Sequence, residues 1–387
     1  MSVYHWLVIL VVLLALLLHG ERKGNKTYIL FAVLLMFCVY GLRDAETIGN
    51  DSSSSYLHSF ERLENTTWDD MPGLSDWFSN DDIGEENAGR DRNVGFQWLM
   101  KLIYDLSDGD YQWFIAVIAA FVMVAVAHLI RRFSPSPVQS ILYYFGLIYF
   151  TMMFNALKQS VAMGFVMFAF CALIDRKPIK FVILVLIGSM FHFPALVFLP
   201  AYWVTKMKVD RNYLILLALL FIATYFFRDR LVDWMTDTYD TTVHENTAMN
   251  FLTNKVLVML VIIVAALVIR PPSSEDKLYC ALLQIIGIAA VIQTFSRYNN
   301  TFERLADYYF QFAIVFIPLV FENVKTERRY LNTRTLALVQ KLGPYLFCAF
   351  AIWRFLDTTV NDATIYPYQF YFQAENAEET ISVLMRL

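Results

Sequence analysis

The stretches FNALKQSVAMGF (154–165), CALIDRKPIKF (171–181) and MFHFPAL (190–196) decide the fold of this chain. Lys158 heads one apolar run, and three basic residues follow the end of that run: Arg176, Lys177 and Lys180. His192 lies at the far end of the next apolar run. Because consecutive membrane-spanning helices run in opposite directions, charge is sorted by side, and His192 returns to the side of Lys158.

The composition is that of a membrane protein. Of 387 residues, 58% are hydrophobic and only 17% are charged, and the mean hydropathy is +0.47. A soluble domain of this length would need far more charge to cover its surface. The net charge of −4 indicates no partner by itself, and we expect no nucleic-acid partner.

The apolar runs predict an all-α, polytopic membrane protein that forms one domain over residues 1–387. A spanning helix needs about 20 mostly apolar residues, and on that criterion we expect about twelve transmembrane or re-entrant helices. An architecture like that of the GT-C glycosyltransferases is compatible with this pattern. The candidate segments lie near 3–19, 26–42, 111–130, 138–154, 157–174, 178–192, 194–205, 211–227, 251–269, 277–295, 302–321 and 336–355.

Basic residues cluster after alternate runs, so the positive-inside rule places both termini outside the cytoplasm. The expected extracytoplasmic segments are a loop at 43–110, a second loop at 228–250 and a C-terminal tail at 357–387. The segment 178–205 is open to two interpretations, because Pro194 interrupts it. It forms either two short spans or a re-entrant hairpin.

The first outside loop is acidic, with thirteen Asp or Glu residues and four Arg residues over 43–92. A solvated acidic surface is the simpler interpretation. A calcium site in DDIGEENAGRD (81–91) is the alternative, although its spacing fits no EF-hand loop. The next stretch has apolar residues at helical spacing with charges between them, so we expect an interfacial helix at 95–106.

Polar and ionisable side chains gather at the predicted outer ends of several helices. Such groups are costly near hydrocarbon, so they usually pair or line a functional cavity. Several basic groups around one cavity suit an anionic ligand such as a diphosphate. Each residue also has a structural alternative: an arginine or lysine at a helix end can snorkel, and neighbouring charges can hold helices together. The candidates are Arg43, Asp51, Asn155, Lys158, Gln159, His192, Arg297, Glu303 and Arg304.

Five stretches together resemble the EpsG family of Wzy-like polysaccharide polymerases. The family pattern reads Asn-x-x-Arg-Gln where this chain has Lys158, which keeps the charge but loses the planar fork of arginine. The stretches, in order, are GLRDAETIGNDSSSSY (41–56), NVGFQWL (93–99), NALKQSVAMGF (155–165), the His192 block with FLPAYW (198–203), and ERLADYYF (303–310).

This resemblance implies transfer of a growing glycan from an undecaprenyl-diphosphate carrier to a lipid-linked repeat unit, at the outer leaflet of a bacterial plasma membrane. Arg43, Lys158 and Arg304 would stabilise the diphosphate leaving group, with Arg297 in reserve. His192 would be the base, with Asp51 and Glu303 as alternatives. Asn155 and Gln159 would bind substrate beside Lys158, and Tyr308 would contact the sugars.

No metal-ligand motif is present, so we expect no cofactor and no metal site. The expected partners are the lipid-linked oligosaccharide and membrane lipids, together with a chain-length regulator and a flippase of the same pathway. Two other functions stay open. One is a flippase for a lipid-linked oligosaccharide, and the other is a polyprenyl-phosphate-dependent glycosyltransferase that adds one sugar. The unusual charges lie at helix ends and not at the bilayer midplane, which favours chemistry at one surface over transport.

Overall fold

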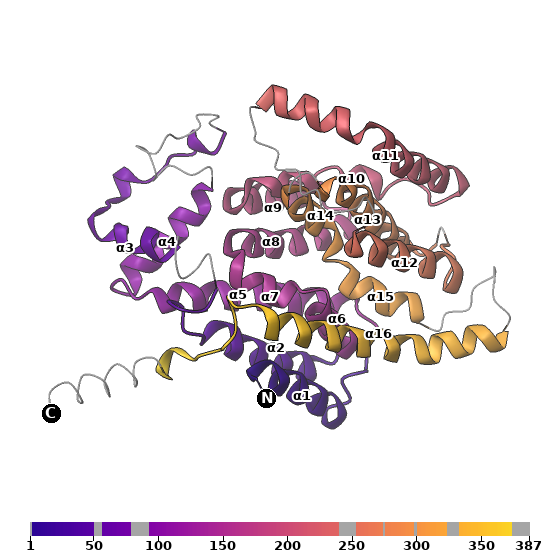
Figure 1. The fold of residues 1–387 in the computed structure, drawn as a ribbon, viewed down its shortest axis with the longest axis horizontal. Coiled ribbons are helices and arrows are strands. Elements are labelled where there is room, and N and C mark those ends of the chain that lie inside the picture. Colours follow the sequence, from indigo (N-terminus) through magenta and orange to yellow (C-terminus); the bar gives the residue numbers. More distant parts are fainter. Residues whose placement is uncertain are drawn as a thin grey trace. The chain divides into compact units, whose positions relative to one another are not determined.

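The computed structural model describes residues 2–49, 56–78, 93–239, 253–273, 275–297, 300–322 and 333–373. Within these ranges every regular element is a helix, as Figure 1 shows. One isolated antiparallel bridge joins Arg43 to Phe370. The prediction of an all-α chain is confirmed.

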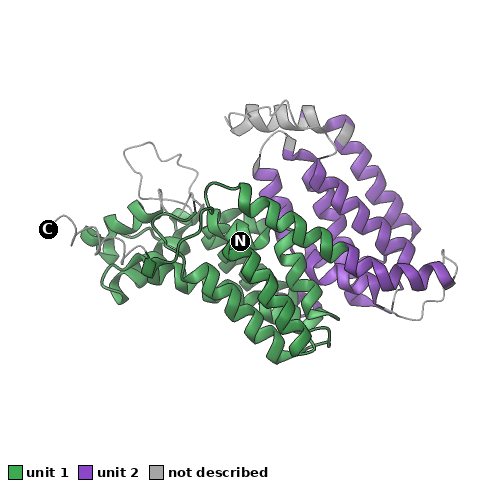
Figure 2. Cartoon of the chain, turned by 60° about the horizontal axis from the view of Figure 1, so that its bottom comes forward, with its two compact units in different colours: residues 1–172, 179–196, 347–387 green, residues 173–178, 197–346 purple. Residues whose placement is uncertain are grey.

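The chain divides into two compact units, coloured separately in Figure 2. Unit 1 consists of residues 1–172, 179–196 and 347–387, and unit 2 of residues 173–178 and 197–346. Each unit is described by itself below.

Unit 1 contains the first seven α-helices, most of α8 and α9, and the second half of α16. Its helices are α1 (Val3–Leu17), α2 (Lys26–Gly41), α3 (Leu57–Glu61), α4 (Val94–Leu106), α5 (Tyr111–Phe133), α6 (Pro137–Gly146), α7 (Tyr149–Asn155), α8 (Leu157–Ile174), α9 (Pro178–Phe191) and α16 (Thr333–Asn361), with short 3-10 turns η2 (Arg62–Asn65), η3 (Trp68–Asp70) and η4 (Asp76–Phe78).

Unit 2 contains the helices between α9 and the second half of α16. They are the last two residues of η6 (Phe193–Phe198), α10 (Ala201–Val204), α11 (Arg211–Tyr239), α12 (Asn254–Ile269), α13 (Lys277–Gln293), η7 (Thr294–Arg297), α14 (Asn300–Phe310), α15 (Ala313–Phe321) and the first half of α16.

Local sequence sets where several helices begin. The side chains of Asn25, Asp110 and Asp276 each accept a hydrogen bond from a backbone N–H in the first turn of the helix that follows. Such N-caps satisfy donors that have no partner within the helix. Pro137 occupies the first turn of α6, where its missing N–H costs nothing.

Several helices are long and apolar enough to cross a membrane. Among the described residues, four single helices meet this test, or six spans if each of two bent pairs counts as one. Six further apolar helices are shorter, at 10–17 residues. The chain is therefore a multi-pass membrane protein, and the count of about twelve spans stays a prediction. The four helices are Tyr111–Phe133, Leu157–Ile174, Lys277–Ser296 and Arg334–Asn361.

The bent pairs interrupt two stretches that we predicted as single spans, 138–154 and 302–321. Helices α6 and α7 meet at 47°, and so do α14 and α15. Ile148, between α6 and α7, has a φ of 70°. This left-handed conformation, which costs a β-branched residue about 1–2 kcal/mol, breaks the helical path two residues after Gly146, the last residue of α6.

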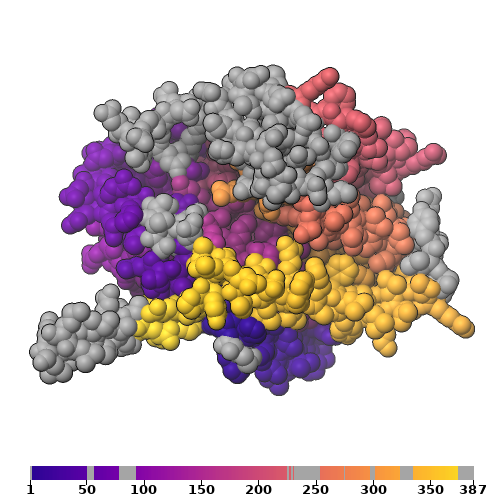
Figure 3. All heavy atoms as spheres, viewed as in Figure 1, coloured from indigo at the N-terminus to yellow at the C-terminus, as the bar shows by residue number. Residues whose placement is uncertain are grey.

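Two predicted loops differ from the structure. Residues 228–239 continue α11, because this stretch has no glycine or proline to end the helix. The predicted tail begins too early, since α16 extends to Asn361. Residues 362–373 then lie against the N-terminal helices of unit 1, and Figure 3 shows the yellow C-terminal segment in contact with the indigo surface.

Candidate functional site

Arg43 follows α2 and is completely buried in unit 1. Its guanidinium carbon lies 4.5 Å from the ring centroid of Tyr40 and 4.7 Å from that of Phe154. The two rings meet edge to face, with their centroids 5.0 Å apart. Aromatic faces attract a cation, so the two rings hold and orient the Arg43 guanidinium.

Asp44, the next residue, is occupied by its own turn. Its carboxylate accepts hydrogen bonds from the backbone N–H of Glu46 and from the hydroxyl of Thr47. These contacts order the chain after α2. Asp51, predicted as an alternative base, lies outside the described residues.

The junction of α7 and α8 carries three further candidates, Asn155, Lys158 and Gln159. The Lys158 ammonium lies 5.3 Å from the ring centroid of Tyr56 and 5.5 Å from that of Phe96. Asn155 donates a hydrogen bond to a hydroxyl of the C-terminal segment, and Gln159 is buried. Lys158 is thus a second cation in contact with aromatic rings.

His192 follows the last residue of α9, and the packing of α8 on α9 fixes its position. At Gly188, a Cβ atom would lie 3.3 Å from the carbonyl oxygen of Ala162, so only glycine permits this approach without a shift. The rings of Phe165 and Phe191 stack at 5.3 Å. The two helices therefore run antiparallel, and His192 lies at the same end of the pair as Lys158.

The first turn of α4 connects these two residues. Asn93 accepts a hydrogen bond from the backbone N–H of Phe193, next to His192. A Cβ atom on Gly95 would lie 2.9 Å from that of Met190, so α4 lies directly on the end of α9. Phe96, in the same turn, contacts the Lys158 ammonium.

Asn93, Gly95 and Phe96 were not among the predicted site residues. Their signal in the sequence is the stretch NVGFQWL (93–99), which contributes to the family resemblance without an assigned role. The predicted helix at 95–106 is observed as Val94–Leu106. Its placement at a membrane interface stays a prediction.

The remaining candidates belong to unit 2. Glu303 accepts a hydrogen bond from the Lys255 ammonium at 2.9 Å, and Lys255 also contacts Asp307 at 2.7 Å. Arg304 is exposed, and Tyr308 is completely buried. Arg297 ends η7, and its side chain lies outside the description.

Sequence reasoning missed Lys255 and Asp307. A lone lysine at the head of an apolar run is the same signal that identified Lys158, and it applies to Lys255 at the start of α12. Of the nine candidates that the structure describes, Arg43, Asn155, Lys158, Gln159 and His192 belong to unit 1, and Arg297, Glu303, Arg304 and Tyr308 belong to unit 2.

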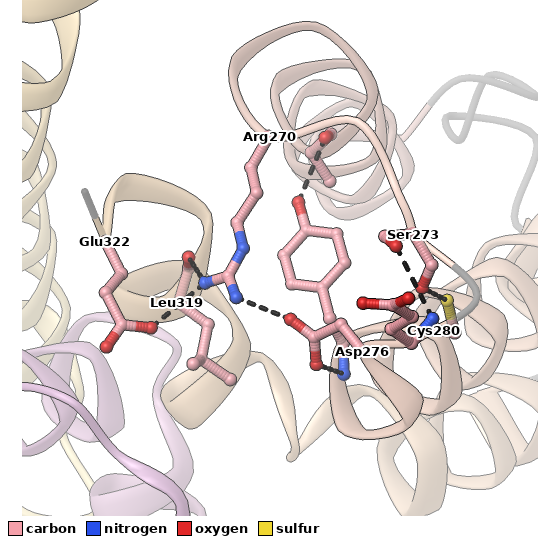
Figure 4. Close-up of polar contacts among 9 residues, drawn as sticks. Arg270, Ser273, Asp276, Cys280, Leu319 and Glu322 are labelled. Atoms are coloured by element: carbon pink, nitrogen blue, oxygen red, sulfur yellow. Dashed lines mark hydrogen bonds and ion pairs between the residues drawn. The ribbon is translucent and has the colours of Figure 1, made fainter. Parts of the chain in front are cut away.

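A different kind of polar cluster surrounds Arg270 in unit 2 (Figure 4). The Arg270 guanidinium donates to the carbonyl oxygen of Leu319 at 2.7 Å, to the Glu322 carboxylate at 3.0 Å and to the Asp276 carboxylate. It also lies over the ring of Tyr279. These contacts join the end of α12 to the start of α13 and the end of α15.

A sequence profile of the EpsG family matches residues 26–370, which is most of the chain. The chain belongs to the EpsG family. No curated protein and no solved structure matches it. EpsG proteins are Wzy-like polysaccharide polymerases, so membership indicates a glycosyltransferase-like polymerase whose substrate is a lipid-linked oligosaccharide.

In this EpsG protein, unit 1 brings two kinds of chemistry to one end of its helices. Arg43 and Lys158 are cations on aromatic rings, suited to an anionic group. His192 is the residue type best suited to proton transfer near neutral pH. Among the described residues, no group of three His, Cys, Asp or Glu side chains could hold a metal ion, and the acidic stretch 81–91 lies outside them.

Proposed function

We propose that this EpsG protein transfers a growing glycan from undecaprenyl diphosphate to the non-reducing end of a second lipid-linked repeat unit. The reaction takes place at the outer leaflet of a bacterial plasma membrane, with both termini of the chain outside the cytoplasm. One observation carries the proposal: Arg43, Lys158 and His192 all lie where α2 and α9 end and α8 begins, in a chain of a polymerase family. We call this region the site end of unit 1.

The bond that breaks joins the anomeric carbon of the donor sugar to a diphosphate oxygen. Negative charge grows on that oxygen as the bond breaks, and fixed positive charge lowers the barrier most when it is already in place. Arg43 is held between two rings and Lys158 beside two others, so both need little rearrangement to receive the charge.

The bond that forms joins the anomeric carbon to a hydroxyl oxygen of the acceptor sugar. His192 accepts the proton of that hydroxyl as the new bond forms, and the diphosphate leaves with the electron pair of the old one. Asp51 and Glu303 are the alternative bases. Glu303 is the weaker alternative, because its carboxylate already accepts a hydrogen bond from the ammonium group of Lys255.

Two further predicted residues of unit 1 complete the substrate contacts in this proposal. Asn155 and Gln159 bind polar groups of the lipid-linked donor beside Lys158. In unit 2, which is described by itself, Arg304 is exposed on α14, and the roles of Arg304 and Arg297 toward the diphosphate stay predictions. Tyr308 contributes through the packing of α14, because no part of its side chain is exposed.

The test is polymerisation by the purified protein supplied with the lipid-linked repeat unit of its host. A ladder of longer glycans is expected on a gel. The His192→Ala variant should lose about 10²–10⁴-fold in rate, the usual contribution of a general base. Lys180→Ala is the matched control, since Lys180 is an exposed cation at the opposite end of the α8–α9 pair. Equal rates for the two variants would refute the role of His192.

We also propose that the reaction needs no metal ion, because arginine and lysine can hold a diphosphate directly. Activity should therefore be unchanged in excess chelator. A loss that one divalent ion restores would contradict this. A chain-length regulator and a flippase remain the expected pathway partners.

A flippase for the same lipid is the second candidate function. The observation that favours it is the presence of two bent helix pairs, α6–α7 and α14–α15, since interrupted helices are common in transporters. Movement of the lipid-linked repeat unit across a liposome bilayer, without a glycan ladder, would make this function the better one.

A further inference from the structure

Residues 362–373, which we call the C-terminal strap, pair with the chain on both sides of Arg43. The backbone N–H of Asp44 donates to the carbonyl oxygen of Gln369 at 3.0 Å, and that of Tyr371 donates to Leu42 at 3.2 Å. Arg43 and Phe370 form the antiparallel bridge between these two bonds. The backbone of Arg43 is therefore held by a segment more than 300 residues away in the sequence.

A second attachment lies at Thr364. Its hydroxyl accepts a hydrogen bond from the side-chain amide of Asn155 at 3.0 Å, and its carbonyl oxygen accepts one from the backbone N–H of Gly49 at 2.7 Å. The Thr364 hydroxyl in turn donates to Asp362 at 2.6 Å, which fixes its orientation. The strap thus joins the turn after Arg43 to the α7–α8 junction, three residues before Lys158.

Two tyrosines make a third attachment. The Tyr4 hydroxyl donates to the carbonyl oxygen of Ile365 at 2.9 Å, and the Tyr368 hydroxyl donates to that of Val39 at 2.6 Å. Burial raises the pKa of Tyr368, and the nearby Arg43 charge opposes that rise. Tyr368 therefore lies within electrostatic reach of the guanidinium, although it comes from the other end of the chain.

We propose that the C-terminal strap is a positioning element of the diphosphate site, and that Thr364 is its central residue. The inference rests on the role proposed above for Arg43 and Lys158. The strap holds the backbone of Arg43 on one side and Asn155 on the other, so it fixes the position of one cation relative to the element that carries the second. A site that binds one diphosphate with two cations depends on that relative position.

The first test compares two shortened chains. A chain that stops after residue 361 lacks the strap, and a chain that stops after residue 373 keeps it and is the matched control. Binding of farnesyl diphosphate to the purified protein is measured directly, together with the KM for the lipid-linked donor. We expect the shorter chain to lose binding and the longer chain to match the full-length protein. Equal binding by both would overturn the proposal.

The second test keeps the strap and removes one contact. Thr364→Val preserves the shape of the side chain but cannot bond to Asn155, and Thr364→Ser keeps the hydroxyl. Thr364→Val should weaken farnesyl diphosphate binding by about threefold to tenfold, as expected for one partly buried hydrogen bond. It should raise the donor KM to the same extent while leaving kcat and the melting temperature close to those of Thr364→Ser. A fall in melting temperature with unchanged affinity would show a structural role only and would overturn the inference.

Arg43→Met separates this inference from the proposed function. Loss of farnesyl diphosphate binding in Arg43→Met, together with unchanged binding in Thr364→Val, would keep the diphosphate site and reject the role of the strap. No binding by the full-length protein would reject both.

Discussion

Arg43 in unit 1 and Arg270 in unit 2 are both buried arginines in an apolar helical protein, and different groups hold them. Arg43 lies between the rings of Tyr40 and Phe154. Arg270 binds two carboxylates and a backbone carbonyl oxygen. Two aromatic faces orient the Arg43 guanidinium, and two carboxylates pair with that of Arg270.

This difference separates two uses of the same residue type. A cation paired with carboxylates fixes the elements that carry them, and its field at a distance is small. A cation on aromatic rings keeps its field and can stabilise an anionic ligand. Burial and charge alone do not distinguish a site residue from a structural one, whereas the groups in contact with the charge do.

The largest effect expected is that of Arg43→Met, which keeps the volume of the side chain and removes its charge. Polymerisation should fall by about 10²–10³-fold, the usual effect of removing one preorganised group that stabilises developing charge. The melting temperature in detergent should change little, because methionine can pack between the two rings. A large loss of stability with normal activity per folded molecule would reverse the assignment of the two arginines.

Arg270→Met is the matched change in unit 2 and should show the opposite pattern. Removing one member of a buried ion pair destabilises strongly, and we expect a loss of about 2–4 kcal/mol, lowered because the two carboxylates are about one-third exposed. Chemical unfolding in detergent measures this loss. Activity of the remaining folded protein should be unchanged, and a specific fall in kcat would contradict the comparison.

Variants of Lys158 test whether its positive charge or the shape of its side chain matters for the proposed diphosphate contact. Lys158→Ala should lose about 10–100-fold in kcat/KM, the range for a hydrogen bond to a charged group. Lys158→Arg should keep most of the activity, because the family pattern places arginine at this position. Steady-state rates with the lipid-linked donor decide the point, and equal losses in both variants would refute the charge role of Lys158.

Gly95→Ala should have the smallest effect. The added methyl group meets Met190 at 2.9 Å, so α4 must move on the end of α9, at a cost of about 1–3 kcal/mol. Phe96 moves with α4, so the environment of Lys158 changes as well. Thermal unfolding measures the cost. Unchanged stability, with unchanged KM for the donor, would show that α4 does not depend on this contact.

Much of unit 1 could be predicted from the sequence, because its information is local. A run of apolar residues between Lys158 and Arg176 sets the bounds of α8, and helical spacing sets those of α4. The alternation of helix direction was enough to place His192 on the side of Lys158. Each of these inferences uses residues close together in the chain.

The contacts that hold the charges could not be predicted in this way. Arg270 bonds to Glu322, and Lys255 bonds to Asp307, each across 52 residues of sequence. Asn155 bonds to Thr364 across 209 residues. Periodicity describes which face of one helix is apolar, and it does not say which other helix covers that face. The C-terminal strap was predicted as a tail for the same reason, since its aromatic residues have no helical period.

The position of the C-terminal strap in the chain has a consequence for how the protein is made. Residues 362–373 are synthesised after helices α1 to α16, yet they bond to Tyr4, Val39 and Asp44. Contacts so distant in sequence form late, because the intervening chain must be in place first. Until residues 362–373 are made, the hydrogen bonds from the strap to Val39, Leu42 and Asp44 cannot form, so the surroundings of Arg43 are completed only after helices α1 to α16 have been made.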